Sequence, residues 1–263
     1  MNAPEIVKVV IIGAGNLAAH LSLALVHQGI EIIQVVNRSS VHGRKLAGKL
    51  GCSFTSMFDQ VDPTADLYVL AVSDRAIIPV AAALKLKDAF VVHTSGTVAM
   101  DLLAPFASRY GVLYPLQTFS KRSRILFSRI PICIEAGDRE SGEQLKQLAE
   151  KLSSSVHFMD HRQRMLLHLA AVFACNFTNF MYTVSEDLLR GSGISFDLLR
   201  PLIEQTARNA RHDDIFRLQT GPAVREDMAV INAHQALLDK REEYLEIYNL
   251  ISKRIINHKK KHG

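Results

Sequence analysis

A polar stripe in the second half of the chain carries the side chains best suited to proton transfer. Residues 161–189 contain neither proline nor glycine, which predicts one long helix. At 100° per residue, one side of this helix holds Arg164, His168, Cys175, Asn179, Tyr182 and Glu186, with Asn176 at its flank. Only His168 titrates naturally near neutral pH, so we expect it to act as a general acid or base, with a structural or ligand-binding role as the alternative.

The two sides of this predicted helix differ in polarity. The second side holds Leu166, Ala170, Phe173, Phe177, Val184 and Leu188, which predicts burial in a core. The polar side mixes amide, small and aromatic side chains, as the wall of a cleft does. We expect Asn176 and Asn179 to join His168 in that wall, and a solvated face or a dimer interface is the alternative.

The residues near the N-terminus indicate what such a cleft would hold. Val7–Ile12 predicts a buried strand, Gly13-Ala14-Gly15 a tight turn, and Asn16–His27 a helix, in the order of a dinucleotide-binding fingerprint. Gly15 lets a pyrophosphate approach the backbone, and the helix N-terminus attracts its charge. The predicted phosphate-binding residues are Gly13, Ala14, Gly15, Asn16 and Leu17. A related domain that has lost its nucleotide is the alternative.

The second strand indicates which dinucleotide binds. Glu31–Val36 is mostly apolar and ends at Asn37-Arg38-Ser39, where NAD sites usually place a carboxylate. A guanidinium between two short hydrogen-bonding side chains suits a 2′-phosphate. We therefore predict that Asn37, Arg38 and Ser39 bind NADP(H) in preference to NAD(H). Additional positive potential is expected from His42, Arg44 and Lys45.

Three further strands are predicted at Asp66–Val72, Ala89–His93 and Gly111–Tyr114. Ligands bind at the carboxyl ends of strands in parallel sheets. The residues placed there are Val72, Ser73, Ser95 and Gly96, which we expect to contact the cofactor, and Gln117, which we expect to take part in catalysis. Ordinary turn chemistry is the alternative for each of them.

Strand-like patterns end near Val156–Met159, and helical periodicity continues to the C-terminus. The sequence therefore predicts an α/β chain, with a Rossmann doubly wound parallel sheet in residues 1–159 and an all-α domain in residues 160–263. In the second domain, helices are expected at Ser195–Arg211, from Thr220-Gly221-Pro222 onward, and at Lys240–Asn257.

The composition is that of a globular protein, with 263 residues, 48% hydrophobic and 22% charged. Three scattered cysteines favour a reducing cytoplasm, and no spacing resembles a metal site. No apolar run approaches the roughly 20 residues of a membrane span. The net charge of +5 favours anionic ligands. We expect the basic C-terminal tail to be a solvated helix end rather than a nucleic-acid site, and the basic loop Ser120–Arg129 to be a surface connection or an anion-binding loop.

Four motifs together resemble a known family: GAGNLA at Gly13–Ala18, YPLQTFS at Tyr114–Ser120, HLAAVFACNFTN at His168–Asn179 and TGPAVR at Thr220–Arg225. They are similar to NADP-binding Rossmann proteins with a helical C-terminal domain, such as pyrroline-5-carboxylate reductases, ketopantoate reductases and 6-phosphogluconate-type dehydrogenases. The resemblance is greatest to NADP oxidoreductases of the coenzyme F420-dependent type that carry a C-terminal domain of unknown function. It implies an NADP-dependent oxidoreductase that forms a homodimer.

One departure from that superfamily bears on mechanism. Several of its enzymes carry a catalytic lysine four residues before an asparagine on the first long helix of the second domain. Val172 and Cys175 stand at the corresponding positions before Asn176 and Asn179. The expected function is therefore hydride transfer between NADP(H) and a small polar, anionic substrate without that lysine. A non-catalytic NADP-binding sensor or scaffold is the alternative.

Overall fold

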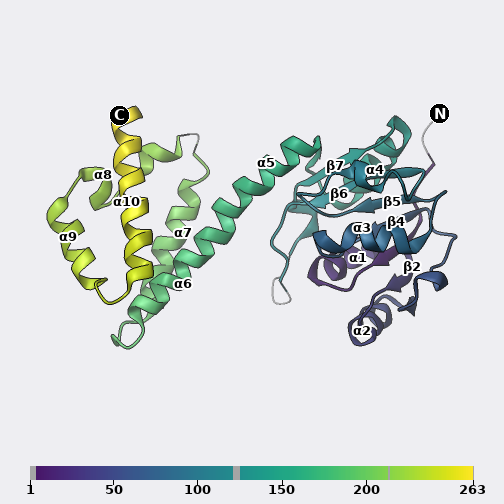
Figure 1. The fold of residues 1–263 in the computed structure, drawn as a ribbon, viewed down its shortest axis with the longest axis horizontal. Coiled ribbons are helices and arrows are strands. Elements are labelled where there is room, and N and C mark those ends of the chain that lie inside the picture. Colours follow the sequence, from purple (N-terminus) through teal and green to yellow (C-terminus); the bar gives the residue numbers. More distant parts are fainter. Residues whose placement is uncertain (1–3, 121–124, 213, 263) are drawn as a thin grey trace. The chain divides into compact units, whose positions relative to one another are not determined.

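The computed structural model describes residues 4–120, 125–212 and 214–262 of the chain (Figure 1). The chain forms two compact units, residues 1–175 and residues 176–263. The predicted domain boundary near Asp160 stays a prediction, because a unit defined by its contacts need not coincide with a domain. Residues 121–124 of the basic loop at Ser120–Arg129, predicted to be a surface connection or an anion-binding loop, lie outside the described residues.

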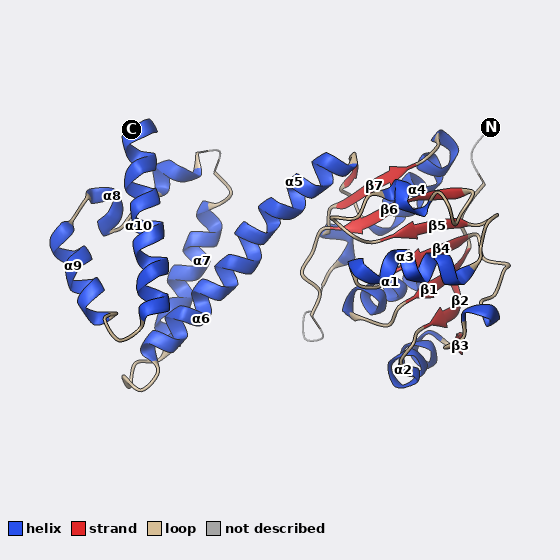
Figure 2. Cartoon of the chain, viewed as in Figure 1, coloured by secondary structure: helices blue, strands red, loops and turns tan. Residues whose placement is uncertain are grey.

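The first unit is built on one sheet of eight strands, shown in red in Figure 2. Its strands are β1 (Lys8–Ile12), β2 (Glu31–Val36), β3 (Ser53–Thr55), β4 (Leu67–Leu70), β5 (Phe90–His93), β6 (Arg109–Pro115), β7 (Ile132–Ala136) and β8 (Val156–Phe158). The order β3-β2-β1-β4-β5-β6-β7-β8 confirms the predicted Rossmann arrangement. One pair departs from it, because β7 runs antiparallel to β6.

Helices cover both faces of this sheet, so its central strands are buried on both sides. Val9 and Ile11 of β1 face one core and Val10 and Ile12 face the other, as the alternation of a strand requires. The first core also contains the buried sides of α1 (Asn16–His27), α2 (Ser40–Leu50) and α4 (Arg139–Leu152), and the second that of α3 (Asp74–Leu84). This double burial explains the near-continuous apolar runs of the strands.

The predicted long helix is present but not uniform. It comprises α5 (His161–Ala171), a π-helical segment at Val172–Phe177, and α6 (Thr178–Leu189). A capping box begins it, in which Asp160 accepts from the Gln163 backbone N–H and the Gln163 side chain accepts from that of Asp160. By length and composition alone, helix His161–Leu189 would be able to span a membrane. The prediction that no segment has this property is therefore corrected.

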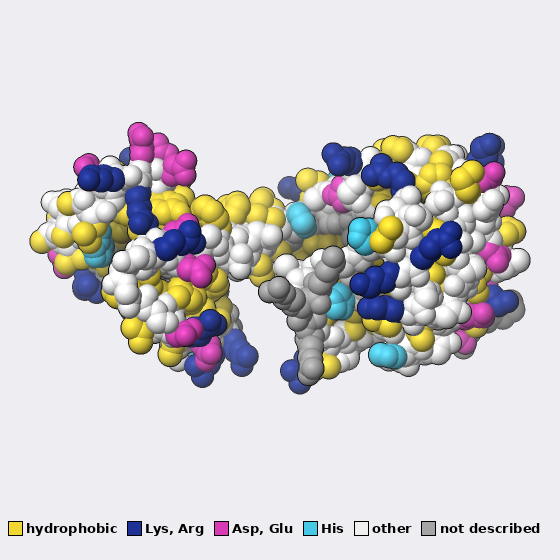
Figure 3. Space-filling view, turned by 90° about the horizontal axis from the view of Figure 1, so that it is seen from below, with side chains coloured by type: hydrophobic (Ala, Val, Ile, Leu, Met, Phe, Trp, Pro, Cys, Tyr) yellow, Lys and Arg dark blue, Asp and Glu magenta, His cyan; other side chains and the backbone are white. Residues whose placement is uncertain are grey.

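The prediction of which helix side is buried was wrong. Leu166 and Phe173, both on the predicted core side, are 67% and 62% exposed, whereas Arg164 on the polar side is 1% exposed. The reason is that α5 contacts β7 and the loop after β5 through polar side chains, and this leaves the apolar side of α5 uncovered. Figure 3 shows apolar side chains gathered along this helix.

The described residues of the second unit form helices and the loops that join them. Its further helices are α7 (Arg200–Asn209), α8 (Pro222–Arg225), α9 (Met228–Leu237) and α10 (Glu242–His262). The helix predicted at Ser195–Arg211 begins as α7 only at Arg200, with Pro201 in its first turn, where proline is tolerated. The single helix predicted from Thr220 onward is divided, because Glu226 adopts a left-handed φ of 55° and Asp227 caps α9 through the Val230 N–H.

Candidate cofactor and proton-transfer site

The turn between β1 and α1 has the form that a diphosphate requires. Gly13 has a φ of +118°, and a Cβ there would lie 2.2 Å from the Ala71 carbonyl oxygen. Gly15 is exposed, and a Cβ added to it would meet no atom within 4 Å. No side chain caps the N-terminus of α1 at Gly15. The open space beside a helix N-terminus therefore fits the phosphates of a dinucleotide.

The segment after β6 lies against this helix. Asn16 Nδ2 donates to the Phe119 carbonyl oxygen at 3.1 Å, and His20 Nε2 lies 3.1 Å from the Ser120 carbonyl oxygen. The His20 and Phe119 rings are 5.6 Å apart. The Asn16 side chain is thus used to hold the end of the YPLQTFS motif, and its predicted contact with the cofactor would be made by its backbone N–H.

The end of β2 carries a guanidinium suited to a 2′-phosphate. Arg38 is exposed, and no ion pair joins it to another described residue. Asn37 Nδ2 donates to the Ser39 carbonyl oxygen at 2.8 Å, which fixes the turn around it. Ser39 Oγ is 3.2 Å from His42 Nδ1. Arg44 lies over the Phe54 ring, 5.3 Å from its centroid, so its stem is held on α2.

We expect Arg38→Ala to raise the Kd for NADPH by about 10–100-fold, because a hydrogen bond to a charged group contributes about 1.5–3 kcal/mol. The Kd for NADH, which lacks the phosphate, should change less than about 3-fold. Fluorescence titration of both cofactors measures this. Arg44→Ala, which removes the same charge nearby, is the matched control with a small expected effect. Equal losses for NADPH and NADH in Arg38→Ala would contradict the assignment.

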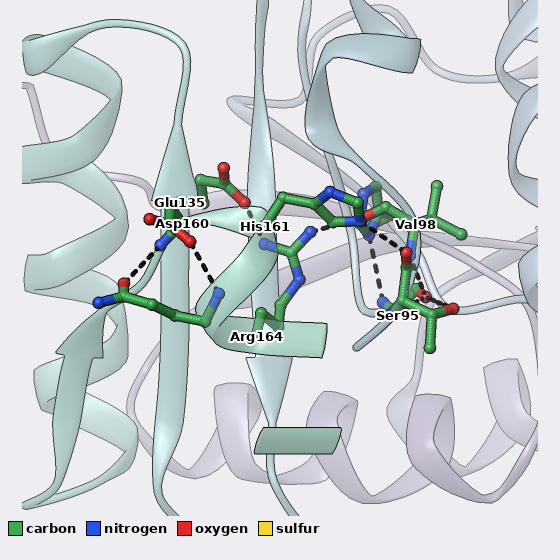
Figure 4. A network of polar contacts seen from close by, with 9 residues as sticks. Ser95, Val98, Glu135, Asp160, His161 and Arg164 are labelled. Carbon is green, nitrogen blue, oxygen red and sulfur yellow. Dashed lines mark hydrogen bonds and ion pairs between the residues drawn. The ribbon is translucent and has the colours of Figure 1, made fainter. Parts of the chain in front are cut away.

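The polar side of α5 is held against the loop that follows β5 (Figure 4). Arg164 forms an ion pair with Glu135 of β7 and donates through Nη2 to the Val98 carbonyl oxygen at 2.5 Å. His161 Nε2 lies 2.9 Å from the Thr97 carbonyl oxygen. These contacts place α5 over the carboxyl end of β5, at the sheet edge where ligands bind.

His168 lies one turn further along the same side of α5. Its Nδ1 is 3.1 Å from the hydroxyl of Tyr114, a residue of β6 that is only 9% exposed. Gly96 completes the contact, because a Cβ there would lie 2.9 Å from both His168 Nδ1 and Tyr114 Cζ. Burial raises the pKa of the Tyr114 phenol to about 12. The phenol is therefore neutral at physiological pH.

A second histidine beneath this loop has a different character. His93, at the end of β5, is fully buried, and its Nδ1 accepts from the Ser95 N–H at 3.2 Å. Burial, reinforced by the nearby Arg164 charge, lowers the pKa of His93 to about 4. His93 is thus neutral at physiological pH, and the charge beneath the loop is carried by the Arg164–Glu135 pair.

The other predicted residues have varied surroundings. Ser95 is buried, and its Oγ accepts from the Thr97 and Val98 N–H groups, so its hydroxyl stabilises the turn. Ser73 is exposed at the N-terminus of α3 beside half-buried Val72. Gln117 is exposed, with Oε1 accepting from the Thr118 N–H at 2.8 Å.

The predicted asparagines, Asn176 and Asn179, are exposed residues of the second unit. Their roles in catalysis stay predictions. Sequence reasoning missed Tyr114 and the Arg164–Glu135 pair as parts of the site. The sequence pattern included Tyr114 only as the first residue of the YPLQTFS motif. Its position at the end of a predicted strand is the signal that could have identified it as a site residue. In the described part of the chain, no group of three or more His, Cys, Asp or Glu side chains is placed to hold a metal ion.

Comparisons with known families agree with the two parts of the sequence. Residues 8–96 match the family described as NADP oxidoreductase, coenzyme F420-dependent, and residues 130–255 match the domain of unknown function DUF2520. A crystal structure of a candidate NADP oxidoreductase from Bacteroides fragilis is 39% identical, covers 96% of this chain and 98% of its own, and has a TM-score of 0.90. The chain therefore belongs to the family of NADP oxidoreductases that carry a DUF2520 domain. The cofactor of this family, NADP, is the one predicted from the sequence.

More distant structures share the fold. A protein from Thermotoga maritima is 24% identical with a TM-score of 0.75 and covers 95% of this chain and 99% of its own. The reductive aminase of Aspergillus terreus, in complex with NADPH and ethyl-5-oxohexanoate, is 15% identical with a TM-score of 0.74, covering 96% and 94%. No curated protein matches the chain.

Proposed function

We propose that this NADP oxidoreductase transfers a hydride between the nicotinamide and a small anionic substrate, with His168 giving or taking the accompanying proton. The observation that carries the proposal is the contact of His168 with Gly96, since it brings a titratable side chain to the carboxyl end of β5. The bound cofactor supplies the hydride, and the protein supplies binding, orientation and the proton.

The residues of the chain have separate parts in this proposal. The backbone around Gly13 and Gly15 and the N-terminus of α1 would hold the diphosphate, and Arg38 would bind the 2′-phosphate. The loop after β5 would lie beside the reacting carbon, with His168 above it. Support for an anionic substrate is electrostatic, because the chain has a net charge of +5 and a field of that sign attracts anions.

A panel of ketones, imines and 2-oxo acids with NADPH tests this function. We expect loss of NADPH absorbance with at least one of them, and faster turnover of a 2-oxo acid than of its uncharged ester. Tight NADPH binding without turnover of any compound would favour the alternative, an NADP-binding sensor. The sensor is suggested by Val172 and Cys175 in place of the lysine of related enzymes.

We expect His168→Ala to lower kcat by about 10²–10⁴-fold, the usual contribution of a positioned acid or base. The Kd for NADPH should stay within about 3-fold of the parent value, since the phosphate sites are untouched. His157→Ala, at an exposed histidine of β8, is the control. Full turnover by His168→Ala would remove His168 from the mechanism.

We further propose that the protein is a homodimer that covers the apolar side of the long helix. The exposed large apolar residues of that helix are Met165, Leu166, Leu169, Phe173, Phe177, Phe180 and Leu188. Half-exposed side chains of this size offer about 100 Å² each, or about 400 Å² for the four in the first unit, Met165, Leu166, Leu169 and Phe173. The rest of the roughly 800 Å² that each partner buries in a stable interface would come from the exposed apolar residues of the second unit.

Light scattering on the full chain measures the oligomeric state. We expect about twice the chain mass of 29.3 kDa, and a shift toward the monomer in Leu166→Asp, a position that is 67% exposed. Val41→Asp, on α2 and 74% exposed, is the matched control. A monomer at micromolar concentration, or recovery of the protein in the membrane fraction, would overturn the proposal.

Two further proposals concern cellular context. We propose a cytoplasmic location, supported by the three cysteines, Cys52, Cys133 and Cys175, which are all free. We also propose that the basic end of α10 is a solvated helix end without a nucleic-acid partner. Its exposed lysines, Lys259, Lys260 and Lys261, have no Phe, Tyr or Trp between them on which a base could stack.

A further inference from the structure

We propose that Tyr114 and His168 form a proton relay, in which the Tyr114 hydroxyl donates to His168 Nδ1 and His168 Nε2–H delivers the proton to a carbonyl oxygen of the substrate. The inference rests on the proposed function and deepens it, because it assigns a positioning residue, Tyr114, and selects a carbonyl compound as the substrate class.

The direction of the hydrogen bond follows from the groups available. Among the described residues, the Tyr114 hydroxyl has one hydrogen-bond partner, His168 Nδ1 at 3.1 Å. A part-buried hydroxyl that used Nδ1–H as its donor would leave its own proton without an acceptor among the described residues, which is unfavourable. The hydroxyl therefore donates, Nδ1 accepts, and the neutral imidazole carries its proton on Nε2. No hydrogen bond from a described residue occupies that Nε2.

The surroundings keep the pair in this geometry. Arg164 fastens α5 one turn before His168, and the Tyr114 ring is anchored on β6 opposite Cys133 of β7. The two rings are 6.3 Å apart and tilted by 58°. Gly96 closes the remaining side, where a methyl group would lie 2.9 Å from His168 Nδ1 and from Tyr114 Cζ. Gly96 is thus a structural requirement of the pair.

The relay balances as follows for carbonyl reduction. NADPH is oxidised, the carbonyl carbon gains the hydride, and negative charge develops on oxygen. The Nε2–H bond of His168 breaks as the substrate O–H bond forms, and the Tyr114 O–H bond breaks as the Nδ1–H bond forms. Tyr114 is left as a phenolate. Water then protonates His168 Nε2 and leaves as hydroxide, and the Nδ1 proton returns to the phenolate, which restores the starting state.

The energetics favour this direction of transfer. Burial raises the pKa of Tyr114 to about 12, so forming the phenolate has a cost. An alkoxide is comparable in basicity to hydroxide, whose conjugate acid has a pKa of about 15.7. Proton transfer from Tyr114 to an alkoxide is therefore downhill. A quaternary iminium gains a hydride without needing any proton, so its reduction does not require the relay.

The first test is spectroscopic and needs no substrate. Long-range ¹H–¹⁵N correlation spectra of the full-length labelled protein, recorded above the titration range of imidazole, report the proton position on His168. We expect protonated Nε2 and a hydrogen-bonded Nδ1 whose resonance moves toward that of an unbonded nitrogen in Tyr114→Phe. Tyr68→Phe is the control, because it removes another part-buried hydroxyl group, which donates a hydrogen bond to the Asp62 carbonyl oxygen. A proton on Nδ1, or no change in Tyr114→Phe, overturns the relay.

The second test separates the relay from a merely structural role. With a ketone that the enzyme reduces, Tyr114→Phe is expected to lower kcat about 100-fold while KM changes little. With a preformed quaternary iminium, the same variant should keep the parent kcat. Gly96→Ala should also alter the Nδ1 resonance, because its methyl group would lie 2.9 Å from His168 Nδ1. Equal losses on both substrates would mean a structural role and overturn the proposal.

Failure of the proposed function gives a different result. If NADPH binds but neither substrate class is reduced by the parent enzyme, the proposed oxidoreductase function fails, and the relay fails with it even if the Nδ1 hydrogen bond is present. If turnover occurs and the spectrum or the kinetic split is absent, only the relay fails.

Discussion

Replacing Glu135 by alanine is expected to lower the free energy of unfolding by about 3–5 kcal/mol, because removal of one partner leaves an unpaired buried charge. That charge is Arg164, which is 1% exposed and pairs with Glu135 across α5 and β7. Its contact with the Val98 carbonyl oxygen does not neutralise it. Equilibrium urea denaturation of the full chain measures the change.

A surface pair provides the control for this prediction. Lys146 and Glu150 are 3.8 Å apart on α4, with side chains 43% and 55% exposed, so Glu150→Ala should cost less than about 1 kcal/mol. Replacing both buried partners, in Glu135→Leu with Arg164→Met, should cost less than either single change, since no charge is left unpaired. A Glu135→Ala protein as stable as Glu150→Ala would show that Arg164 finds solvent or another partner.

The second large effect is expected at Gly13, where alanine should destabilise the fold and abolish tight NADPH binding. The added Cβ would lie 2.2 Å from a backbone oxygen, that of Ala71, which cannot move without shifting the end of β4. The φ of +118° adds strain of about 1–3 kcal/mol, and overpacking adds about 1–3 kcal/mol more. Urea denaturation and fluorescence titration with NADPH measure the two consequences.

Gly15→Ala is the matched comparison, because it separates fold from binding. Gly15 has a φ of −76°, which alanine adopts freely, and its added Cβ would meet no protein atom within 4 Å. Stability should stay within about 0.5 kcal/mol of the parent, while NADPH affinity falls because the methyl group enters the phosphate space. Unchanged NADPH affinity in Gly15→Ala, or a Gly13→Ala protein with parent stability, would contradict the assigned cofactor turn.

Local patterns were sufficient to predict the sheet and most helices. Helix α1 has the predicted bounds, Asn16–His27, because its apolar pattern follows the glycine turn directly and ends before Gly29. The strands were recognisable because burial on both faces makes them continuously apolar. The antiparallel direction of β7 was not predictable, since an apolar run looks the same in both directions.

The site was less predictable because its contacts join distant residues. Arg164 reads as a solvated residue until Glu135 and Val98, 29 and 66 positions earlier, are placed beside it. Tyr114 and His168 are 54 positions apart. The cofactor turn is different, because one strand, one turn and one helix are contiguous in sequence and carry their own signal. At the N-terminus of α3, Ser73 stands at the cap position, and Asp74 accepts from the Thr97 hydroxyl, 23 positions away.

The π-helical segment at Val172–Phe177 changes which side chains of the long helix lie on the same face. A widened turn accommodates one residue more than an α-helical turn does, so it offsets the helical phase by about 100°. Side chains after Phe177, such as Asn179 and Tyr182, are therefore out of phase with Arg164 and His168 on a simple helical wheel. Deleting a single residue inside the segment would restore that phase and rotate every later side chain of the helix to a different azimuth.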